Sequence, residues 1–454
     1  MRVQGVPGRC RAIAARPERG RRVRLRPGGP GPGPDPGLPD GGDPRRLDGG
    51  RRIDRPAGAR FPGHGGCAVP HRDAAPSAAG ARRGRAPRLG PPDRRPTVRI
   101  AVLAWRDLTH PRAGGSEYVV DHLCVGLQDR GHDVVLLAGS PVGAHPYPVQ
   151  PLGGTFDQYL RAPWALRRHV GRVDVVLDVQ NGIPYFAPLW QGAPVVCLVH
   201  HVHTEQWAME FPAPVATFGR WLERSVMPRV YRRSTYVAVS DSTKRALTAI
   251  GVAADAVHTI EMGAAPVGVT GERSIEPRFL VLGRLVPHKR VDLALRCWPR
   301  VRAAIGGTLV IAGDGPDAVA LRARAGPDDG VEFTGYVSEE RKAAELGAAW
   351  LLVHPAHHEG WGTVIIEAAA AGVPAVGFDV GGVRDSVVAG ETGILARSED
   401  EFVSAWIRLG SDAALRIRMG DSARSRAAAL TWPAALDRME TVLHNATTPT
   451  GWRR

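Results

Sequence analysis

The chain from residue 97 onward alternates between short apolar runs and longer amphipathic stretches. Nearly continuous apolar runs are typical of strands buried on both faces, whereas apolar residues spaced three and four apart are typical of helices. The runs expected to form strands are residues 98–104, 132–138, 174–177, 195–199, 236–239, 308–312, 331–337, 350–353 and 375–378, with a further strand that begins at Phe279. Because strands and helices alternate along the chain, the pattern predicts an α/β protein with parallel sheets.

Two stretches break this pattern and divide the chain. Residues 1–96 lack sustained apolar periodicity, and residues 264–277 lose it again while they gain Pro, Gly and Thr. The expected parts are an N-terminal extension (1–96), a first domain (97–265), a linker (266–277), a second domain (278–431) and a final helix (432–447).

The extension carries the whole net charge of the chain. Residues 1–96 contain 22 arginines, no lysine and 8 acidic residues, which gives +14, the formal charge of the full sequence. The remaining residues are therefore neutral, and the sequence argues against a nucleic-acid-binding body. With one aromatic residue (Phe61) and abundant Gly and Pro, the extension is expected to be disordered. It has no apolar core of a signal peptide, and an alternative is that translation starts downstream of Met1.

Residues 350–382 form one strand–loop–helix–strand unit in this pattern. The helix expected over residues 363–371 ends at Gly372, with Pro374 just beyond it. Such a unit places a glycine-rich loop and the free N–H groups of a helix start at the carboxyl edge of a sheet, where anions such as phosphate bind. Two carboxylates flank this anion site, Glu359 in the loop and Glu367 in the helix, and they are expected to face different parts of one ligand.

Together with Gly360, Gly362 and the alanine-rich helix, this pair resembles the Glu-seven-Glu signature of retaining family 4 glycosyltransferases. The resemblance implies the GT-B fold, in which two Rossmann-like, doubly wound α/β domains face a cleft and a C-terminal helix crosses back to the first domain. It also implies a nucleotide-diphosphate sugar as the donor substrate, with no cofactor.

The same resemblance assigns roles to other motifs. His200, directly after the strand at 195–199, is expected beside the transferred sugar together with Glu359 as a catalytic group, and His201 is the rival for that place. Glu367 is expected to accept hydrogen bonds from ribose, and Arg284 with Lys289 to hold the diphosphate. The positions expected to bind the donor are Gly114, Gly115, Arg284, Lys289, Gly313, Val337, Gly362, Thr363, Val364 and Glu367.

No metal is expected at this site. His200, His201 and His203 lie within four residues, but no fitting cysteine or carboxylate group accompanies them, and alternation would send His200 and His201 to opposite sides. The body also lacks the Asp-x-Asp pair that holds a divalent cation in many transferases. Cationic side chains and a helix start can stabilise the leaving diphosphate instead, so we expect metal-independent transfer.

The cysteines and the remaining composition suggest a cytoplasmic enzyme. Cys10, Cys67, Cys124, Cys197 and Cys297 show no paired spacing, and core packing is expected for those in the body. No apolar run is long enough to span a membrane. Residues 159–169 and 218–233 mix arginines with Trp and Tyr, a mixture that suits peripheral contact with anionic lipid at the inner membrane face. The alternative is an ordinary helix that packs through its apolar stripe and keeps its arginines in solvent, and Pro228 is expected to interrupt a continuous helix there.

The predicted function is the transfer of a hexose to a glycan, a lipid-linked molecule or a small molecule. The absence of a G-x-G-x-x-G fingerprint argues against an oxidoreductase. Two alternatives stay open: a GT-B nucleotide-sugar epimerase or phosphorylase, and a non-catalytic nucleic-acid-binding protein that acts through the basic extension.

Overall fold

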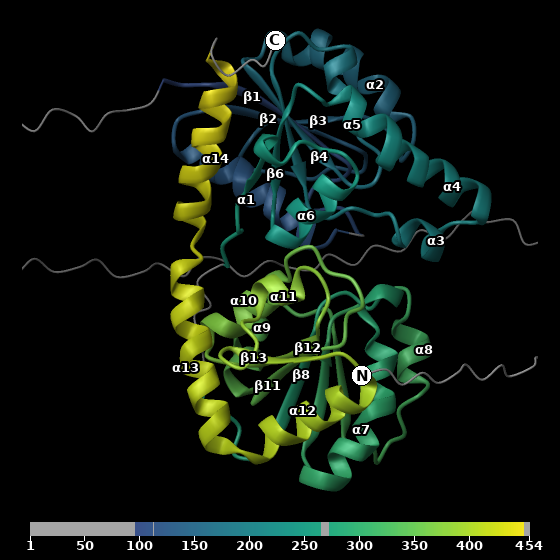
Figure 1. Ribbon diagram of the computed structural model, residues 1–454, viewed down its shortest axis with the longest axis vertical. Coiled ribbons are helices and arrows are strands. Elements are labelled where there is room, and N and C mark those ends of the chain that lie inside the picture. Colours follow the sequence, from purple (N-terminus) through teal and green to yellow (C-terminus); the bar gives the residue numbers. More distant parts are fainter. Residues whose placement is uncertain (1–95, 112, 265–271, 449–454) are drawn as a thin grey trace, which may run out of the picture. The chain divides into compact units, whose positions relative to one another are not determined.

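The computed structural model describes residues 96–111, 113–264 and 272–448 (Figure 1). The disorder expected for residues 1–96 therefore concerns a segment that lies almost wholly outside the described residues, and so does most of the expected linker. The described chain forms two parallel sheets with helices around them, which confirms the predicted fold class.

The first sheet contains seven parallel strands in the order β3-β2-β1-β4-β5-β6-β7. Its strands are β1 (Arg99–Ala104), β2 (Asp133–Ala138), β3 (Val149–Pro151), β4 (Val175–Gln180), β5 (Val195–Val199), β6 (Thr235–Ala238) and β7 (Val257–Thr259). Ile100 and Val102 of β1 belong to one core cluster, whereas Ala101 and Leu103 belong to another. Because successive strand residues face opposite sides, both faces of this sheet are covered.

The second sheet contains six parallel strands in the order β10-β9-β8-β11-β12-β13. Its strands are β8 (Arg278–Leu282), β9 (Thr308–Ala312), β10 (Val331–Gly335), β11 (Leu351–His354), β12 (Ala375–Phe378) and β13 (Gly393–Ala396). In both sheets the strand order reverses beside the first strand, between β1 and β4 and between β8 and β11. Ligands of such sheets bind at this reversal, beyond the carboxyl ends of the strands.

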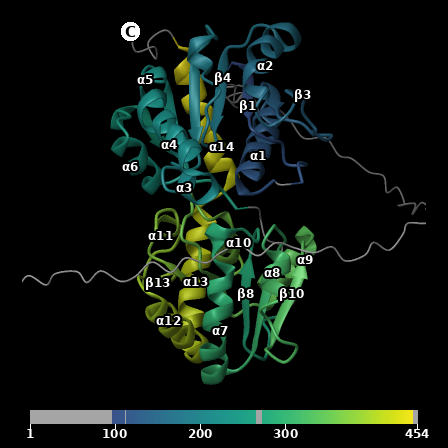
Figure 2. The same cartoon turned by 90° about the vertical axis from the view of Figure 1, so that its right-hand side faces the viewer.

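The helices pack on both faces of their sheets (Figures 1 and 2). Those of the first half are α1 (Gly115–Asp129), α2 (Gln158–Ala165), α3 (Gln206–Glu210), α4 (Ala213–Trp221), α5 (Met227–Val230) and α6 (Asp241–Ala249). Those of the second half are α7 (Val291–Ile305), α8 (Ala318–Arg322), α9 (Glu339–Ala348), α10 (Thr363–Ala370), α11 (Val383–Ser386), α12 (Glu399–Ser411), α13 (Ala413–Ala429) and α14 (Trp432–Thr447).

The last helix packs on the first sheet rather than the second (Figure 1). Leu436, Met439 and Leu443 of α14 lie in the same core cluster as Leu123 and Leu127 of α1. A Cβ at Gly126 of α1 would lie 2.3 Å from Leu436, so the glycine permits the close approach of the two helices. Arg130, at the end of α1, contacts Asp437 at 2.6 Å and Glu440 at 2.9 Å.

Two local expectations differ from the structure. Residues 239–244 predict a helix start with Asp241 or Ser242 as the N-cap, but the N-cap of α6 is Ser240, whose side chain accepts a hydrogen bond from the Thr243 amide. Pro228 does not end the helix that contains it: α4 continues through a π-helical turn (Leu222–Val226) into α5. The wider turn just before Pro228 tolerates the missing N–H and the ring of this residue.

The body cysteines lie in the core as expected. Cys124, Cys197 and Cys297 are free and buried, whereas Cys10 and Cys67 lie outside the described residues. Burial raises the pKa of the Cys297 thiol, and the thiol is therefore an unreactive packing group.

Candidate active site

The reversal point of the second sheet brings together two loops that carry predicted site residues. Gly283 and Arg284 follow β8, and residues 355–362 follow β11. Gly313, after β9, has φ +144°, and a Cβ there would lie only 1.9 Å from the carbonyl oxygen of Gly283. A side chain at position 313 would therefore displace the backbone that leads into Arg284.

Glu359 sits in a half-buried cluster with two partners. Nζ of Lys289 makes an ion pair with Oε2 of Glu359, and Nε2 of His354 lies 3.2 Å from the same oxygen. Burial raises the pKa of Glu359, but the charge of Lys289 and the His354 contact outweigh burial and hold that pKa well below its usual range. Glu359 is thus a carboxylate, fixed within reach of the predicted phosphate-binding lysine.

Glu367 is buried and has a lysine of its own. Nζ of Lys342, from α9, lies 2.8 Å from Oε1 of Glu367 and 2.7 Å from Oε2 of Glu339. The ammonium group also lies 5.9 Å from the ring centre of Tyr118 in the other half of the chain. Burial raises the pKa of Glu367, and Lys342 opposes this effect.

Arg284 lies against the glycine pair of the first sheet. A Cβ at Gly114 would lie 3.1 Å from Cδ and 3.3 Å from Nη1 of Arg284, so the glycine permits the arginine to approach the start of α1. A Cβ at Gly115 would meet no atom within 4 Å. Within the described part of the chain, the Arg284 guanidinium has no ion pair or hydrogen bond. Its charge is therefore free for an anionic ligand.

His200 is held beside the Glu359 loop by its backbone. A Cβ at Gly360 would lie 2.3 Å from the His200 carbonyl oxygen, which itself accepts a hydrogen bond from Thr243 Oγ1 at 3.0 Å. Ser240 Oγ donates to the Gly360 carbonyl at 2.8 Å. Burial lowers the pKa of His200 to about 4, and its Nε2 has no hydrogen-bond partner among the described residues. The ring is thus a neutral, unsatisfied polar group.

The neighbouring histidines pack against one another through their rings. His201 lies 3.9 Å from His203 and 5.0 Å from His358, measured between ring centres. His201 Nε2 lies 2.7 Å from Gln206 Oε1. Among residues 96–111, 113–264 and 272–448, no group of three or more His, Cys, Asp or Glu has the arrangement of a metal site.

The start of α10 completes this side of the site. Gly362 caps the helix in the left-handed conformation, with φ +76°, and a Cβ there would lie 3.4 Å from Cγ of Glu359. Thr363 and Val364 form the first turn that follows. Val337 lies after β10 and packs on the core beneath α10, beside the exposed Tyr336. The predicted donor-site residues therefore lie on loops and in the first two turns of helices that follow the carboxyl ends of strands in both sheets.

Comparison with known proteins agrees with this architecture. Residues 276–412 match the family described as Glycosyl transferases group 1, and residues 113–266 match Glycosyltransferase Family 4. The GDP-mannose-dependent alpha-(1-6)-phosphatidylinositol monomannoside mannosyltransferase of Mycobacterium tuberculosis is 30% identical over 333 residues, which cover 65% of this chain and 81% of that protein. The chain belongs to the family 4 glycosyltransferases.

Two further proteins are similar to this chain. The glycogen synthase of M. tuberculosis is 26% identical over 357 residues, covering 67% of this chain and 83% of the relative. The crystal structure of Anabaena HepE in complex with UDP and glucose aligns with a TM-score of 0.62 at 16% identity, over 76% of this chain and 99% of that chain. This structural likeness supports the GT-B fold.

Three residues of this glycosyltransferase contact the predicted site but were missed from the sequence. Lys342 pairs with Glu367, His354 contacts Glu359, and Glu117 accepts a hydrogen bond from the Gly114 amide at 2.8 Å. Only the rarity of lysine in the chain could have drawn attention to Lys342. His354 is the last residue of a buried strand, and no motif in the sequence around it marks it as a site residue.

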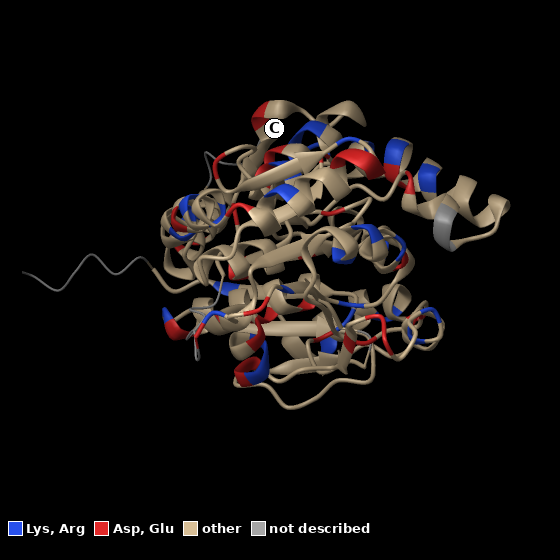
Figure 3. Cartoon of the chain, turned by 90° about the horizontal axis from the view of Figure 1, so that it is seen from below, with Lys and Arg blue, Asp and Glu red and all other residues tan. Residues whose placement is uncertain are grey.

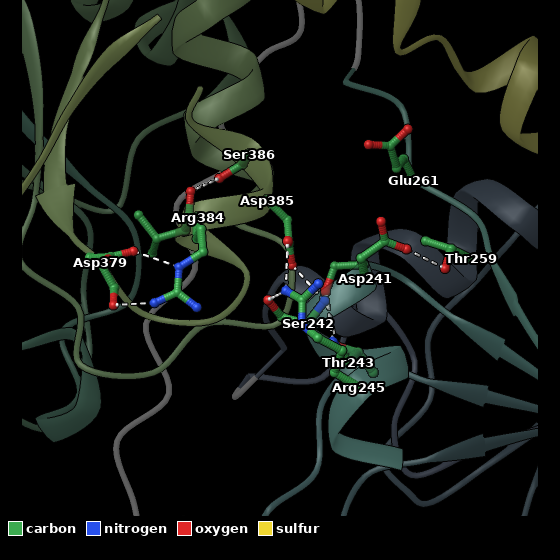
Figure 4. Close-up of polar contacts among 12 residues, drawn as sticks. Asp241, Ser242, Thr243, Arg245, Thr259, Glu261, Asp379, Arg384, Asp385 and Ser386 are labelled. Carbon is green, nitrogen blue, oxygen red and sulfur yellow. Dashed lines mark hydrogen bonds and ion pairs between the residues drawn. The ribbon is translucent and has the colours of Figure 1, made fainter. Parts of the chain in front are cut away.

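A pocket of about 690 Å³ lies elsewhere, beside α6, α11 and β12 (Figure 4). None of the predicted site residues lines it. Its charged side chains are engaged with others nearby: Arg384 pairs with Asp379 at 2.6 Å, Arg245 with Asp385 at 3.4 Å, and Thr259 donates to Asp241 at 2.7 Å. Because these polar groups already have partners and none of the predicted site residues lines the pocket, we assign no catalytic role to it.

Proposed function

We propose that this glycosyltransferase moves a hexosyl group from a nucleoside-diphosphate sugar to a hydroxyl of a glycan, lipid-linked or small-molecule acceptor. In this proposal the transfer retains the anomeric configuration and needs no divalent metal. The unengaged charge of Arg284, which faces the start of α1 from the second sheet, is the observation that carries the proposal.

The diphosphate is the group that matches these charges. Bond cleavage at the anomeric carbon leaves negative charge on the phosphate oxygens, and preorganised cations lower the free energy of that transition state. Arg284 is free for this role, and Lys289 would exchange part of its contact with Glu359 for the phosphate. The N–H groups at the start of α10 add partial positive charge on the same side.

Glu359 and His200 would contact the sugar of the donor, and Glu367 would contact its ribose. Glu359, held ionised by Lys289, would accept hydrogen bonds from sugar hydroxyls and stabilise positive charge that develops at the anomeric carbon. His200 would satisfy its free Nε2 with a sugar hydroxyl. Glu367 would accept the ribose hydroxyls while Lys342 holds it in place.

Similar proteins indicate which donors to test first. One relative is named as GDP-mannose-dependent, and the aligned HepE structure contains UDP and glucose. Both nucleotides present a diphosphate, which is the part that Arg284 and Lys289 would contact. Their bases differ, and the base would contact the backbone near Val337.

The experiment is a screen of UDP-, GDP- and ADP-hexoses for protection against thermal unfolding and for donor hydrolysis. The proposal expects at least one donor to raise Tm and to be hydrolysed in the wild type, and both effects to weaken in Arg284→Ala. NMR of the product formed with an accepting glycoside then gives the anomeric configuration. The absence of both effects for every donor, or the formation of an epimer without an acceptor, would overturn the proposal.

A further inference from the structure

Helix α4 and Phe211, which lies just before it, expose large apolar side chains. Phe211, Val215, Phe218 and Trp221 are 41%, 47%, 57% and 53% exposed. The last three are spaced three apart, so they lie on one side of the helix. On its opposite side, Gly219 packs so closely on the buried Trp207 that a Cβ there would lie 2.5 Å from the indole. The exposed side chains of α4 therefore cannot turn toward the protein, because Trp207 already occupies the space on the inner side of the helix.

Helix α2 and the turn before it show the same arrangement. Phe156, Leu160 and Trp164 recur every four residues and are 74%, 84% and 62% exposed, whereas Ala162 and Ala165 are buried. Ala162 shares its core cluster with Met227 at the start of α5. The α2 and α4–α5 segments therefore cover the same face of the first sheet, and both lie on the side of Figure 1 that faces the viewer in Figure 2.

Most charged residues within 156–172 and 211–233 are basic, whereas Glu205 and Glu210 lie just before the second of these ranges. Residues 156–172 and 211–233 contain only two acidic residues, Asp157, which pairs with Arg161 at 2.8 Å, and the buried Glu223. The arginines in the same segments are Arg161, Arg167, Arg168, Arg172, Arg220, Arg224, Arg229, Arg232 and Arg233. In Figure 3 the helical segment that projects from the body is mainly tan, with blue bands along it and red bands at its base.

We propose that these exposed faces of α2 and α4, the docking surface, bind the surface of an anionic lipid bilayer. Aromatic and aliphatic side chains enter the interfacial layer, and arginines beside them are attracted to acidic headgroups. A second copy of the chain is the poorer occupant, because a two-fold contact would place these basic surfaces against each other. The body of the chain is neutral as a whole, so the positive charge of these segments is balanced by acidic residues elsewhere and the attraction arises locally.

The docking surface is connected to the candidate active site. Oε1 of Glu223, in the turn after α4, accepts a hydrogen bond from the His203 amide. Trp207 lies between Gly219 of α4 and Gly182 after β4, where a Cβ would lie 3.1 Å from the indole. A bilayer bound here would therefore lie next to the loop that carries His200 to His203, and would bring a lipid-linked acceptor to this loop of the first domain.

The test is sedimentation of the full-length protein with vesicles of phosphatidylcholine alone or with phosphatidylglycerol. The variants are Phe218→Glu/Trp221→Glu on α4 and Leu160→Glu/Trp164→Glu on α2. The matched control is Val319→Glu/Ile417→Glu, which changes two exposed apolar residues of the second half that are 81% and 62% exposed. All proteins share the basic N-terminal extension, so differences between them report the docking surface.

We expect wild type and control to bind phosphatidylglycerol vesicles, and each surface variant to bind at least about fivefold less. The donor should protect the wild type, the control and both surface variants equally against thermal unfolding. Equal protection would show that the variants are folded and bind the donor, so that a loss of vesicle binding would concern the docking surface and not the proposed function. Arg220→Glu/Arg224→Glu should weaken binding to the anionic vesicles and reduce its salt dependence. Unchanged vesicle binding by both surface variants would overturn the proposal, as would a change only in oligomeric state.

Discussion

The ammonium group of Lys342 lies 2.8 Å from a carboxylate oxygen of the buried Glu367. The chain contains only three lysines, and two of them pair with the two glutamates of the Glu-seven-Glu motif, Lys289 with Glu359 and Lys342 with Glu367. Each carboxylate of the motif thus has its own cation before any donor binds. Burial alone would favour a protonated Glu367, so its ability to accept ribose hydroxyls depends on Lys342.

Lys342→Met should therefore destabilise the protein and weaken donor binding. Removal of one partner of a buried ion pair costs on the order of 3–5 kcal/mol, because the remaining charge is left unpaired. Chemical denaturation and donor titration measure the two effects. The control is Lys244→Met, a partly exposed lysine on α6, and Lys342→Met/Glu367→Gln should recover part of the stability. Equal stability in Lys342→Met and the control would contradict the role of the pair.

Arg284→Ala should reduce transfer without reducing stability. A charge-assisted hydrogen bond to phosphate contributes roughly 1.5–3 kcal/mol, about one to two factors of ten in rate. Arg284 has no ion-pair partner in the described chain, so its loss leaves no unpaired acid, whereas Lys289→Ala would remove the ion pair of Glu359 and leave only the His354 contact, and should lower Tm as well. Arg300→Ala, a surface arginine that pairs with Asp400 on α12, serves as the control in both assays. Normal transfer by Arg284→Ala would remove this residue from the site.

Transfer should persist in excess EDTA. The proposal assigns the stabilisation of the leaving diphosphate to Arg284, Lys289 and the start of α10 rather than to an ion. Initial rates with and without chelator, after extensive dialysis, provide the measurement. Loss of activity that Mg²⁺ or Mn²⁺ restores would mean that the residues of this site do not replace a metal.

Folding stability should fall as the pH drops from about 6.5 toward 4. Burial lowers the pKa of both His200 and His288 to about 4, with the charge of Lys289 adding to the effect at His288. Unfolded histidines titrate near 6.5, so between these values the unfolded chain binds protons that the folded chain does not, and stability rises with pH in that window. Glu359, whose folded pKa is depressed, adds a further loss below about 4.5.

Thermal unfolding between pH 4.5 and 8 measures this dependence. His200→Asn should show a shallower rise in Tm between pH 5 and 6.5 than the wild type, because one of the titrating groups is gone. Parallel curves for the wild type and His200→Asn would show that His200 is not the buried neutral group described above.

The parts of the structure that the sequence predicts are those governed by local pattern. Residues 195–199, 308–312 and 375–378 were expected as strands and form β5, β9 and β12 with the same bounds, because continuous apolar runs leave little choice in a sheet covered on both faces. The three-residue strands β3 and β7 were not expected, since runs that short have no periodicity. Ser, Asp and Asn are similarly good N-caps, so the sequence did not distinguish Ser240 from Asp241.

The contacts that build the site were less predictable. Lys342 and Glu367 lie on different helices, and Gly114 and Arg284 lie on different sheets, so neither pair has a sequence spacing that marks it. The close contact of Gly360 with the His200 carbonyl likewise follows from how two loops meet. Residue type predicted the charges present at the site, and tertiary packing determined which of them became paired.

The position of α14 has a consequence for the synthesis of this protein. The first sheet is complete by residue 259, but Leu436, Met439 and Leu443 complete the core beside α1. During translation the first half therefore emerges with an uncovered apolar face and waits for almost two hundred further residues. A nascent chain stalled before residue 432 would be a substrate for chaperones, and an expressed first domain would need residues 432–447 supplied as a fused or added peptide to fold.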